Sequence, residues 1–319
     1  MRHSVIRPSR ALAVNYTLKQ LRYFVLTAEL KSVTAASAKA NISQPSISSA
    51  ISELESAFDA KLFLRHHAKG LSLTAVGHQV FDEAKRLLAQ ADRFSQVSRE
   101  VVKGLSGTIQ LGCLVTLAPL VMPPLMKAVQ ANHPKLSVGC AELDVSSLLK
   151  EVRAGTFEGA ISYNLNLEND VSFRGVRSFP PYVLLSRQHP LTRNTRIKLQ
   201  SLADEPMILL DLPYTRDYFR SIFESAGFAP KIVYRTTSPQ MVRSMVASGM
   251  GYSILNARPS WRHSFDEHAH AYATVELSEL LPSLTMGLIS LKDHVFTKAA
   301  QIVIEEFERQ NKGKQGLRG

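Results

Sequence analysis

Residues 43–55 place a row of short polar side chains along one side of an expected helix. Ser43 caps this helix and Pro45 lies in its first turn, where a missing N–H costs nothing. Apolar residues recur at steps of four and three through Ile47, Ile51 and Leu54, so the other side is buried. An uncharged face of donors and acceptors suits base edges in a DNA major groove. We assign to this contact Gln44, Pro45, Ser46, Ser48, Ser49 and Ser52, together with Thr34 from the preceding helix.

A second group of polar residues lies at the ends of expected strands or the starts of expected helices further along the chain. In open α/β sheets a ligand binds beyond the carboxyl ends of the strands, where helix N-termini point. Converging hydroxyls and helix starts favour a polar or anionic small molecule, a carboxylate among them. Plain helix capping explains any single member equally well, so the prediction concerns the cluster. Its members are Thr116, Tyr163, Tyr214, Thr215, Ser238 and Asn256.

Other reactive residues lack the spacing that catalysis or metal binding needs. Cys113 and Cys140 are expected on neighbouring strands; a redox sensor is one interpretation, but buried strand cysteines are usually inert. The histidines and carboxylates of residues 263–270 fit no standard metal-ligand pattern and are interpreted as a solvated loop. Neither a nucleophile elbow nor a phosphate loop occurs. We therefore predict no catalytic residue, no metal and no cofactor.

The segments around residues 43–55 complete a winged helix-turn-helix. Residues 18–25 form a helix with Leu18, Leu21 and Val25 on one face. Residues 32–40 form a short helix capped by Ser32 or Thr34, which ends at Asn41 because Asn tolerates the left-handed conformation of a tight turn.

Two short alternating runs, residues 62–65 and 71–74, flank a turn that contains Gly70. This pattern predicts a β-hairpin, the wing of the module. Arg65 and Lys69 lie near its tip, where they can reach a phosphate or a minor groove.

These motifs together resemble the LysR-type transcriptional regulators. The resemblance covers about residues 16–310 and is weaker after Gly104. It implies a linker helix that dimerises, a two-lobed regulatory domain akin to periplasmic solute-binding proteins, tetramers built from dimers, DNA bending and contact with RNA polymerase. An amphipathic helical bundle that binds proteins instead of DNA is the alternative. The motifs that carry the resemblance are residues 21–24 (Leu-Arg-Tyr-Phe), 43–48 (Ser-Gln-Pro-Ser-Ile-Ser), Ile51, 54–55, 62–63, Arg65, 73–74 and Gly77.

Residues 75–103 contain no Pro and predict one long helix. Apolar and small residues alternate at steps of four and three, the pattern of a coiled-coil seam. A dimer would present two recognition helices to successive major grooves and predicts a near-palindromic operator. A helix packed only on its own domain is the alternative. The seam consists of Val80, Ala84, Leu87, Ala91, Phe94, Ser98 and Val101.

From Thr108 onward, apolar runs alternate with helical segments in a βαβ rhythm that predicts a mainly parallel, helix-flanked sheet in two lobes. The first lobe has strands at 109–114, 136–143 and 159–163, with helices at 117–132 and 147–154. The second has strands at 182–186, 207–210, 231–235 and 252–255, with helices at 217–226 and 239–248. A strand at 284–291 and a helix at 295–310 return to the first lobe. The chain crosses between lobes near Phe179 and Leu281.

The charge of the chain is concentrated at its N-terminal end. Of 319 residues, the first 104 hold 15 Lys and Arg against 8 Asp and Glu, while the rest hold 23 against 19. A domain that binds the phosphates of DNA requires such an excess of positive charge. The chain has two Cys, no secretion signal and no apolar run of about 18 residues, so we expect a cytoplasmic protein without membrane contact.

The predicted fold is a multi-domain α/β chain with four parts. An N-terminal arm (1–16), or an upstream start codon, precedes the winged helix-turn-helix (17–74) and the dimerisation helix (75–104). The effector-binding domain (105–319) has lobe 1 at about 105–179 and 283–319 and lobe 2 at about 180–282. We predict a sequence-specific transcriptional regulator, a homodimer or homotetramer, controlled by a small-molecule effector. An enzyme on a two-lobed solute-binding fold with a fused DNA-binding module is the alternative; an exported solute-binding protein lacks its signal here.

Overall fold

The computed structural model describes residues 15–66, 70–103, 105–258 and 271–312. Lys69 and the histidines and carboxylates of residues 263–270 lie outside the described residues. The chain divides into two compact units, Met1–Ser95 and Gln96–Gly319, which are described separately. Across the described ranges, no helix is long and apolar enough to cross a membrane.

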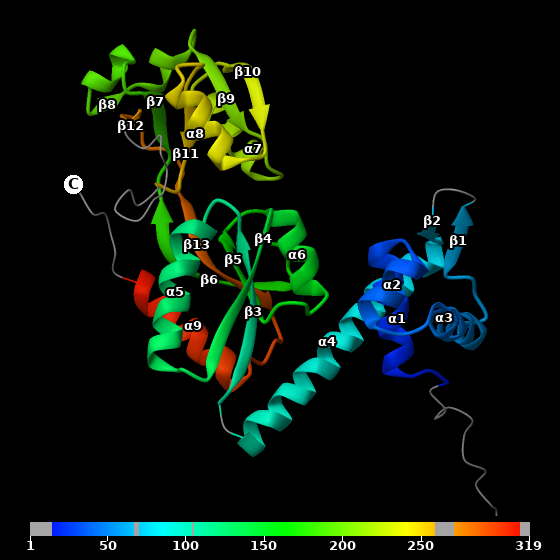
Figure 1. The fold of residues 1–319 in the computed structure, drawn as a ribbon. Helices are drawn as coiled ribbons and strands as arrows, with labels where there is room; N and C mark the ends of the chain where they lie inside the picture. The colour runs from blue at the N-terminus through cyan, green and yellow to red at the C-terminus, as the bar shows by residue number, and fades with distance from the viewer. Residues whose placement is uncertain (1–14, 67–69, 104, 259–270, 313–319) are drawn as a thin grey trace, which may run out of the picture. The chain divides into compact units, whose positions relative to one another are not determined.

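The N-terminal unit is a three-helix module with a β-hairpin (Figure 1). Thr17 forms a capping box with Gln20 at the first helix, and Ser32 caps the second through the N–H of Ala35. Asn41 has the predicted left-handed conformation, with φ of 56°. The elements are α1 (Leu18–Leu30), α2 (Val33–Ala40), α3 (Gln44–Phe58), β1 (Phe63–His66), β2 (Gly70–Leu73) and α4 (Ala75–Lys103).

The core of this unit joins α1, α3 and the start of α4. Phe24 is fully buried and meets Phe63 edge to face, with ring centroids 5.4 Å apart. Ala84 and Leu88 of α4 are buried in the same cluster. Leu18 was predicted on the buried face of α1, yet it is exposed because it occupies the first turn, at the edge of this core.

The helix α4 confirms the predicted helix over residues 75–103. Ala84 of the predicted seam packs on its own domain, whereas Leu87 and Phe94 are exposed, Phe94 to 74%. Val97 beside them is also exposed. Ser98 is exposed too, and the side chain of Val101 lies outside the described residues. The described part of α4 therefore carries a strip of exposed apolar side chains.

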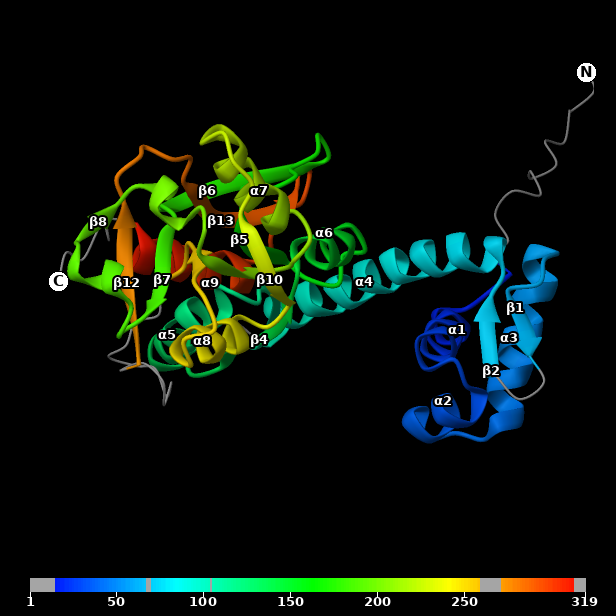
Figure 2. The same cartoon turned by 90° about the horizontal axis from the view of Figure 1, so that it is seen from above.

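Lobe 1 of the second unit is a five-stranded sheet in the order β4-β3-β5-β13-β6. Helices α5 and α9 cover one face and α6 the other (Figures 1 and 2). The prediction of a mainly parallel sheet is wrong in part: β3 runs parallel to β4 and β5, but β13 runs antiparallel to β5 and β6. The cause is that β13 arrives from the other lobe and not through a helical crossover. The elements are β3 (Gly107–Leu114), α5 (Ala118–Asn132), β4 (Leu136–Leu143), α6 (Val145–Arg153), β5 (Gly159–Tyr163), β6 (Val171–Phe179), β13 (Leu284–Leu291) and α9 (Lys298–Asn311).

Lobe 2 contains a four-stranded sheet, β11-β7-β12-β8, and the parallel pair β9 and β10. A bridge between Met207 and Tyr252 joins the two. The chain enters this lobe after Phe179 and leaves it before Leu284, near the predicted crossings. The elements are β7 (Tyr182–Ser186), η2 (Pro190–Arg193), β8 (Arg196–Ile197), η3 (Leu199–Leu202), β9 (Pro206–Leu210), α7 (Thr215–Ser225), β10 (Lys231–Thr236), α8 (Pro239–Ala247), β11 (Ser253–Leu255) and β12 (Tyr272–Leu277).

Candidate DNA interface and effector pocket

The outer face of α3 is polar and open to solvent. Ile47, Ile51 and Leu54 are buried beneath it. On the outside, Ser49 donates to Glu53 at 2.9 Å and Ser46 lies 2.8 Å from the hydroxyl of Ser43. On the same face, the side chains of Gln44, Ser48 and Ser52 make no hydrogen bond to any described residue. All the α3 residues assigned to DNA, and Thr34 of α2, are exposed except Ser48, which is half-buried.

Glu55, near the C-terminal end of α3, joins this helix to the wing. Its carboxylate accepts hydrogen bonds from the N–H of Leu62 at 2.9 Å and of Phe63 at 3.4 Å, and from Lys61 at 2.7 Å. Burial alone would raise the pKa of Glu55, but these hydrogen bonds prevail and lower it. The wing is thereby held in a fixed position relative to the recognition helix.

The hairpin β1–β2 pairs Phe63 with Leu73 and Arg65 with Leu71. Gly70 has φ of +81°, and a Cβ there would lie 2.8 Å from the carbonyl oxygen of Lys31. Only glycine fits this close approach to the end of α1. The backbone of Arg65 is part of β1, while its side chain lies outside the described residues, as does the whole of Lys69.

A pocket between the two lobes collects four of the six residues predicted to bind an effector. Thr116 precedes α5 and Tyr163 ends β5, both in lobe 1; Thr215 begins α7 and Asn256 follows β11 in lobe 2. The pocket has an empty volume of about 320 Å³, including the part open to solvent. Its remaining lining residues are Leu210, Phe219, Pro239, Arg243, Leu255 and Ala257.

Five polar side-chain atoms around this pocket are buried and have no hydrogen-bond partner among the described residues. Buried polar atoms in folded proteins are almost always paired, so such a cluster marks a place where another molecule completes the bonding. Tyr163, Thr215 and Asn256 are 2%, 4% and 5% exposed. The atoms are Thr116 Oγ1, Tyr163 Oη, Thr215 Oγ1, Arg243 Nε and Asn256 Oδ1.

Two predicted residues do not line this pocket. The hydroxyl of Ser238 accepts from the N–H of Met241 at 3.2 Å, so it caps α8. Tyr214 packs beside the core of lobe 1. Arg243 was not predicted, because a lone Arg inside an amphipathic helix normally faces solvent.

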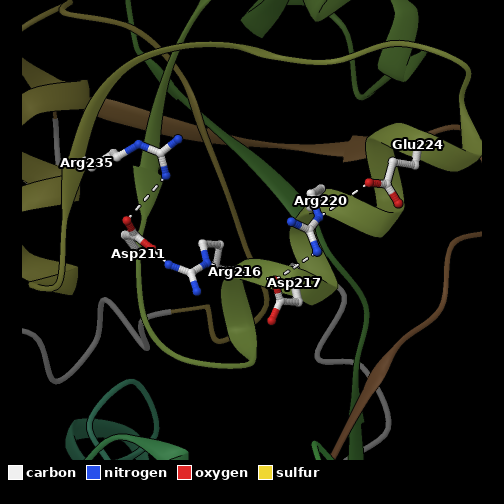
Figure 3. Close-up of polar contacts among 6 residues, drawn as sticks. All are labelled: Asp211, Arg216, Asp217, Arg220, Glu224 and Arg235. Atoms are coloured by element: carbon white, nitrogen blue, oxygen red, sulfur yellow. Dashed lines mark hydrogen bonds and ion pairs between the residues drawn. The ribbon is translucent and has the colours of Figure 1, made fainter.

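A hydroxyl donor and a pair of salt bridges lie in or beside this pocket. Burial raises the pKa of Tyr163 well above its usual value, so its phenol remains a donor. Asp211, at the end of β9, accepts from Arg216 at 3.0 Å and from Arg235 at 3.3 Å (Figure 3). These ion pairs join β9 to β10 and to the start of α7, next to Thr215.

The two cysteines lie on the neighbouring strands β3 and β4, as predicted. Cys113 pairs with Glu142 and Cys140 with Leu111, so the thiols are offset along the strands. Burial raises the pKa of Cys113 and of Cys140. Both raised pKa values oppose formation of the reactive thiolate.

Two family models match the chain. The bacterial regulatory helix-turn-helix protein, lysR family, matches residues 18–78, and the LysR substrate binding domain matches residues 103–312. The chain belongs to the LysR family. It is therefore a DNA-binding transcriptional regulator with an effector-binding domain, in a family of regulators and not of enzymes. This finding removes the enzyme alternative.

Full-length LysR-family structures share this fold. HinK of Pseudomonas aeruginosa is 33% identical, with a TM-score of 0.61 over 93% of this chain and 99% of that chain. CbnR complexed with its target DNA is 21% identical, with a TM-score of 0.69 over 92% and 99%. The uncharacterized HTH-type transcriptional regulator YvbU of Bacillus subtilis is 28% identical over 284 residues, 86% of this chain and 95% of that protein.

Proposed function

We propose that α3 enters the major groove of a near-palindromic operator as one of two copies in a homodimer. The exposed polar face of α3 supports base contacts by Gln44, Ser48 and Ser52. Arg65 and Lys69 of the wing are assigned to phosphates. The exposed strip of α4 supports dimerisation, with a homotetramer as a further step. The residues that complete this interface are Thr34, Pro45, Ser46 and Ser49.

We further propose four parts for the chain: an N-terminal arm at 1–16, the DNA-binding domain at 17–74, the linker helix at 75–104 and the regulatory domain at 105–319. Because its target is DNA, we place the protein in the cytoplasm. Contact with RNA polymerase enters this proposal from the family resemblance.

The interlobe pocket is the proposed effector site, for a polar or anionic small molecule such as a carboxylate. The observation that carries this proposal is the set of five unpaired polar atoms around one pocket. An effector changes the DNA-bound state only if it binds two arrangements of the protein with different affinity. Regulation then follows from the difference between those two affinities.

Footprinting of the full-length protein on genomic fragments tests the DNA half of this proposal. We expect protected promoters with inverted half-sites about 10–10.5 base pairs apart, or a multiple of that spacing. Protection that is unrelated to sequence, or a single half-site per dimer, would overturn it.

A further inference from the structure

The orientation of the Asn256 side-chain amide is fixed by its neighbours. Its Nδ2 donates to the carbonyl of Phe179 and to the hydroxyl of Tyr218, each at 2.9 Å. Tyr218 donates its own hydrogen to the carbonyl of Pro282 at 2.7 Å, so its oxygen is left to accept from Asn256. Turning the amide over would break both contacts of Nδ2. Oδ1 is therefore the atom left for the pocket.

Oδ1 of Asn256 needs a donor that the protein does not supply. An amide oxygen only accepts hydrogen bonds. The hydroxyls of Thr116, Tyr163 and Thr215 line the same pocket, yet none of them pairs with it in the part of the chain that the structure describes. A molecule that satisfies this atom must carry an O–H or N–H group.

The charge of the pocket indicates which charged groups the bound molecule carries. Among the described residues, Arg243 donates a hydrogen bond to the neutral Gln240 at 3.4 Å but forms no ion pair, and no Asp or Glu lines the pocket. Helices α7 and α8 begin at Thr215 and Pro239 of the lining, and helix N-termini favour negative charge. An ammonium group would meet Arg243 without a counter-charge. The donor is therefore a neutral group, and a hydroxyl is the smallest one that fits.

The size and the apolar part of the lining limit the hydrocarbon portion. The empty volume of about 320 Å³ includes space that is open to solvent, so the enclosed part of the pocket admits only a short chain. Leu210, Phe219 and Leu255 provide an apolar wall.

We propose that the effector is a short hydroxycarboxylate, with its carboxylate at Arg243 and its hydroxyl donating to Oδ1 of Asn256. This assignment rests on the proposed function of the pocket as the effector site. The hydroxyls of Thr116, Tyr163 and Thr215 are then free to donate to the carboxylate oxygens.

Calorimetric titration of the full-length protein with matched triples of acids tests this proposal. Suitable triples are lactate, propionate and alanine; 2-hydroxyisovalerate, isovalerate and valine; and mandelate, phenylacetate and phenylglycine. We expect at least one hydroxy acid to bind about tenfold or more tightly than its unsubstituted and its amino counterparts, because only it satisfies Oδ1 without adding a positive charge.

Each of the other possible results would overturn a stated part of the proposal. Equal binding of hydroxy and unsubstituted acids would overturn the hydroxyl assignment and leave an anionic effector standing. Tighter binding of the amino acids would overturn the neutral donor. No binding by any member would overturn both this inference and the anionic effector.

The variant Arg243→Gln locates the carboxylate. We expect it to weaken binding of the preferred acid about tenfold or more, while Arg220→Gln, an exposed arginine of the same lobe already paired with Asp217 and Glu224, leaves affinity unchanged. Unchanged affinity in Arg243→Gln, with a circular dichroism spectrum like that of the unaltered protein, would overturn the placement.

Discussion

The carboxylate of Glu55 accepts a hydrogen bond from the backbone N–H of Leu62 at 2.9 Å. This contact joins the recognition helix α3 to the strand that begins the wing. The helix α3 and the wing therefore share one largely buried anchor.

Replacing Glu55 by Ala should lower the free energy of unfolding of the N-terminal unit by about 1–3 kcal/mol, because two backbone N–H groups lose their acceptor. The folded-state pKa of Glu55 is lowered, so its contribution is complete above its usual value of 4.5 and is lost as pH falls through the lowered pKa. Urea unfolding at pH 7 and pH 3 should show a smaller difference between variant and wild type at pH 3. Glu29→Ala, at an exposed position of α1, is the control. A pH-independent difference would contradict this account.

Replacing Gln44 or Ser48 by Ala should reduce discrimination between operator and random DNA by about 1–3 kcal/mol for a good base contact. Both side chains lie on the outer face of α3 with free hydrogen-bonding groups. Competition binding assays measure the ratio of affinities. Ser56→Ala, exposed near the end of the same helix, should leave that ratio unchanged. An unchanged ratio in both variants would rule out the groove assignment.

Replacing Arg65 by Ala should weaken binding to operator and random DNA alike. A phosphate contact releases counterions, so the slope of log affinity against log salt should fall by about 1. Titrations at several salt concentrations measure the slope. Arg216→Ala, in the regulatory domain, should keep it, and a retained slope in Arg65→Ala would remove the phosphate role.

Introducing Glu at both Leu87 and Phe94 should dissociate the proposed dimer. Both side chains are exposed in the single chain, and dimerisation through this seam would bury the new charges. Light scattering gives the mass of the particle in solution. His78→Glu places the same charge at an exposed position off the seam and should not alter the mass. A dimer that persists in the double variant would show that α4 does not hold it.

Cys113 should not react with thiol reagents in the folded protein, because it is fully buried and burial raises its pKa. Alkylation followed by mass spectrometry, with and without urea, measures its reactivity. The half-buried Cys140 serves as the internal comparison. A disulfide between Cys113 and Cys140 after peroxide treatment of native protein would reverse this view.

Periodicity in the sequence was sufficient for elements with one clearly buried face. The strands β4, β5, β7 and β13 begin and end at the predicted residues. β6 was not predicted, because Arg174, Gly175 and Arg177 interrupt its apolar pattern and only its two ends are buried. It is a strand because it pairs with β13 along its length, a long-range contact that no local window contains.

Part of the candidate site could also be predicted from the sequence. Thr116, Tyr163, Thr215 and Asn256 meet because strand ends and helix starts converge in this type of sheet. Ser238 also lies at the start of a helix, but its hydroxyl accepts a hydrogen bond from the N–H of Met241 in that same helix. Arg243 enters the pocket from inside a helix, where sequence position alone does not distinguish it from a solvent-facing arginine.

Asn256 also touches both segments through which the lobes are joined. Its amide holds the carbonyl of Phe179, where the chain leaves lobe 1, and through Tyr218 it reaches the carbonyl of Pro282, where the chain returns. A molecule that binds Oδ1 of Asn256, as proposed, would therefore contact the side chain that is hydrogen-bonded to one connecting segment and, through Tyr218, to the other.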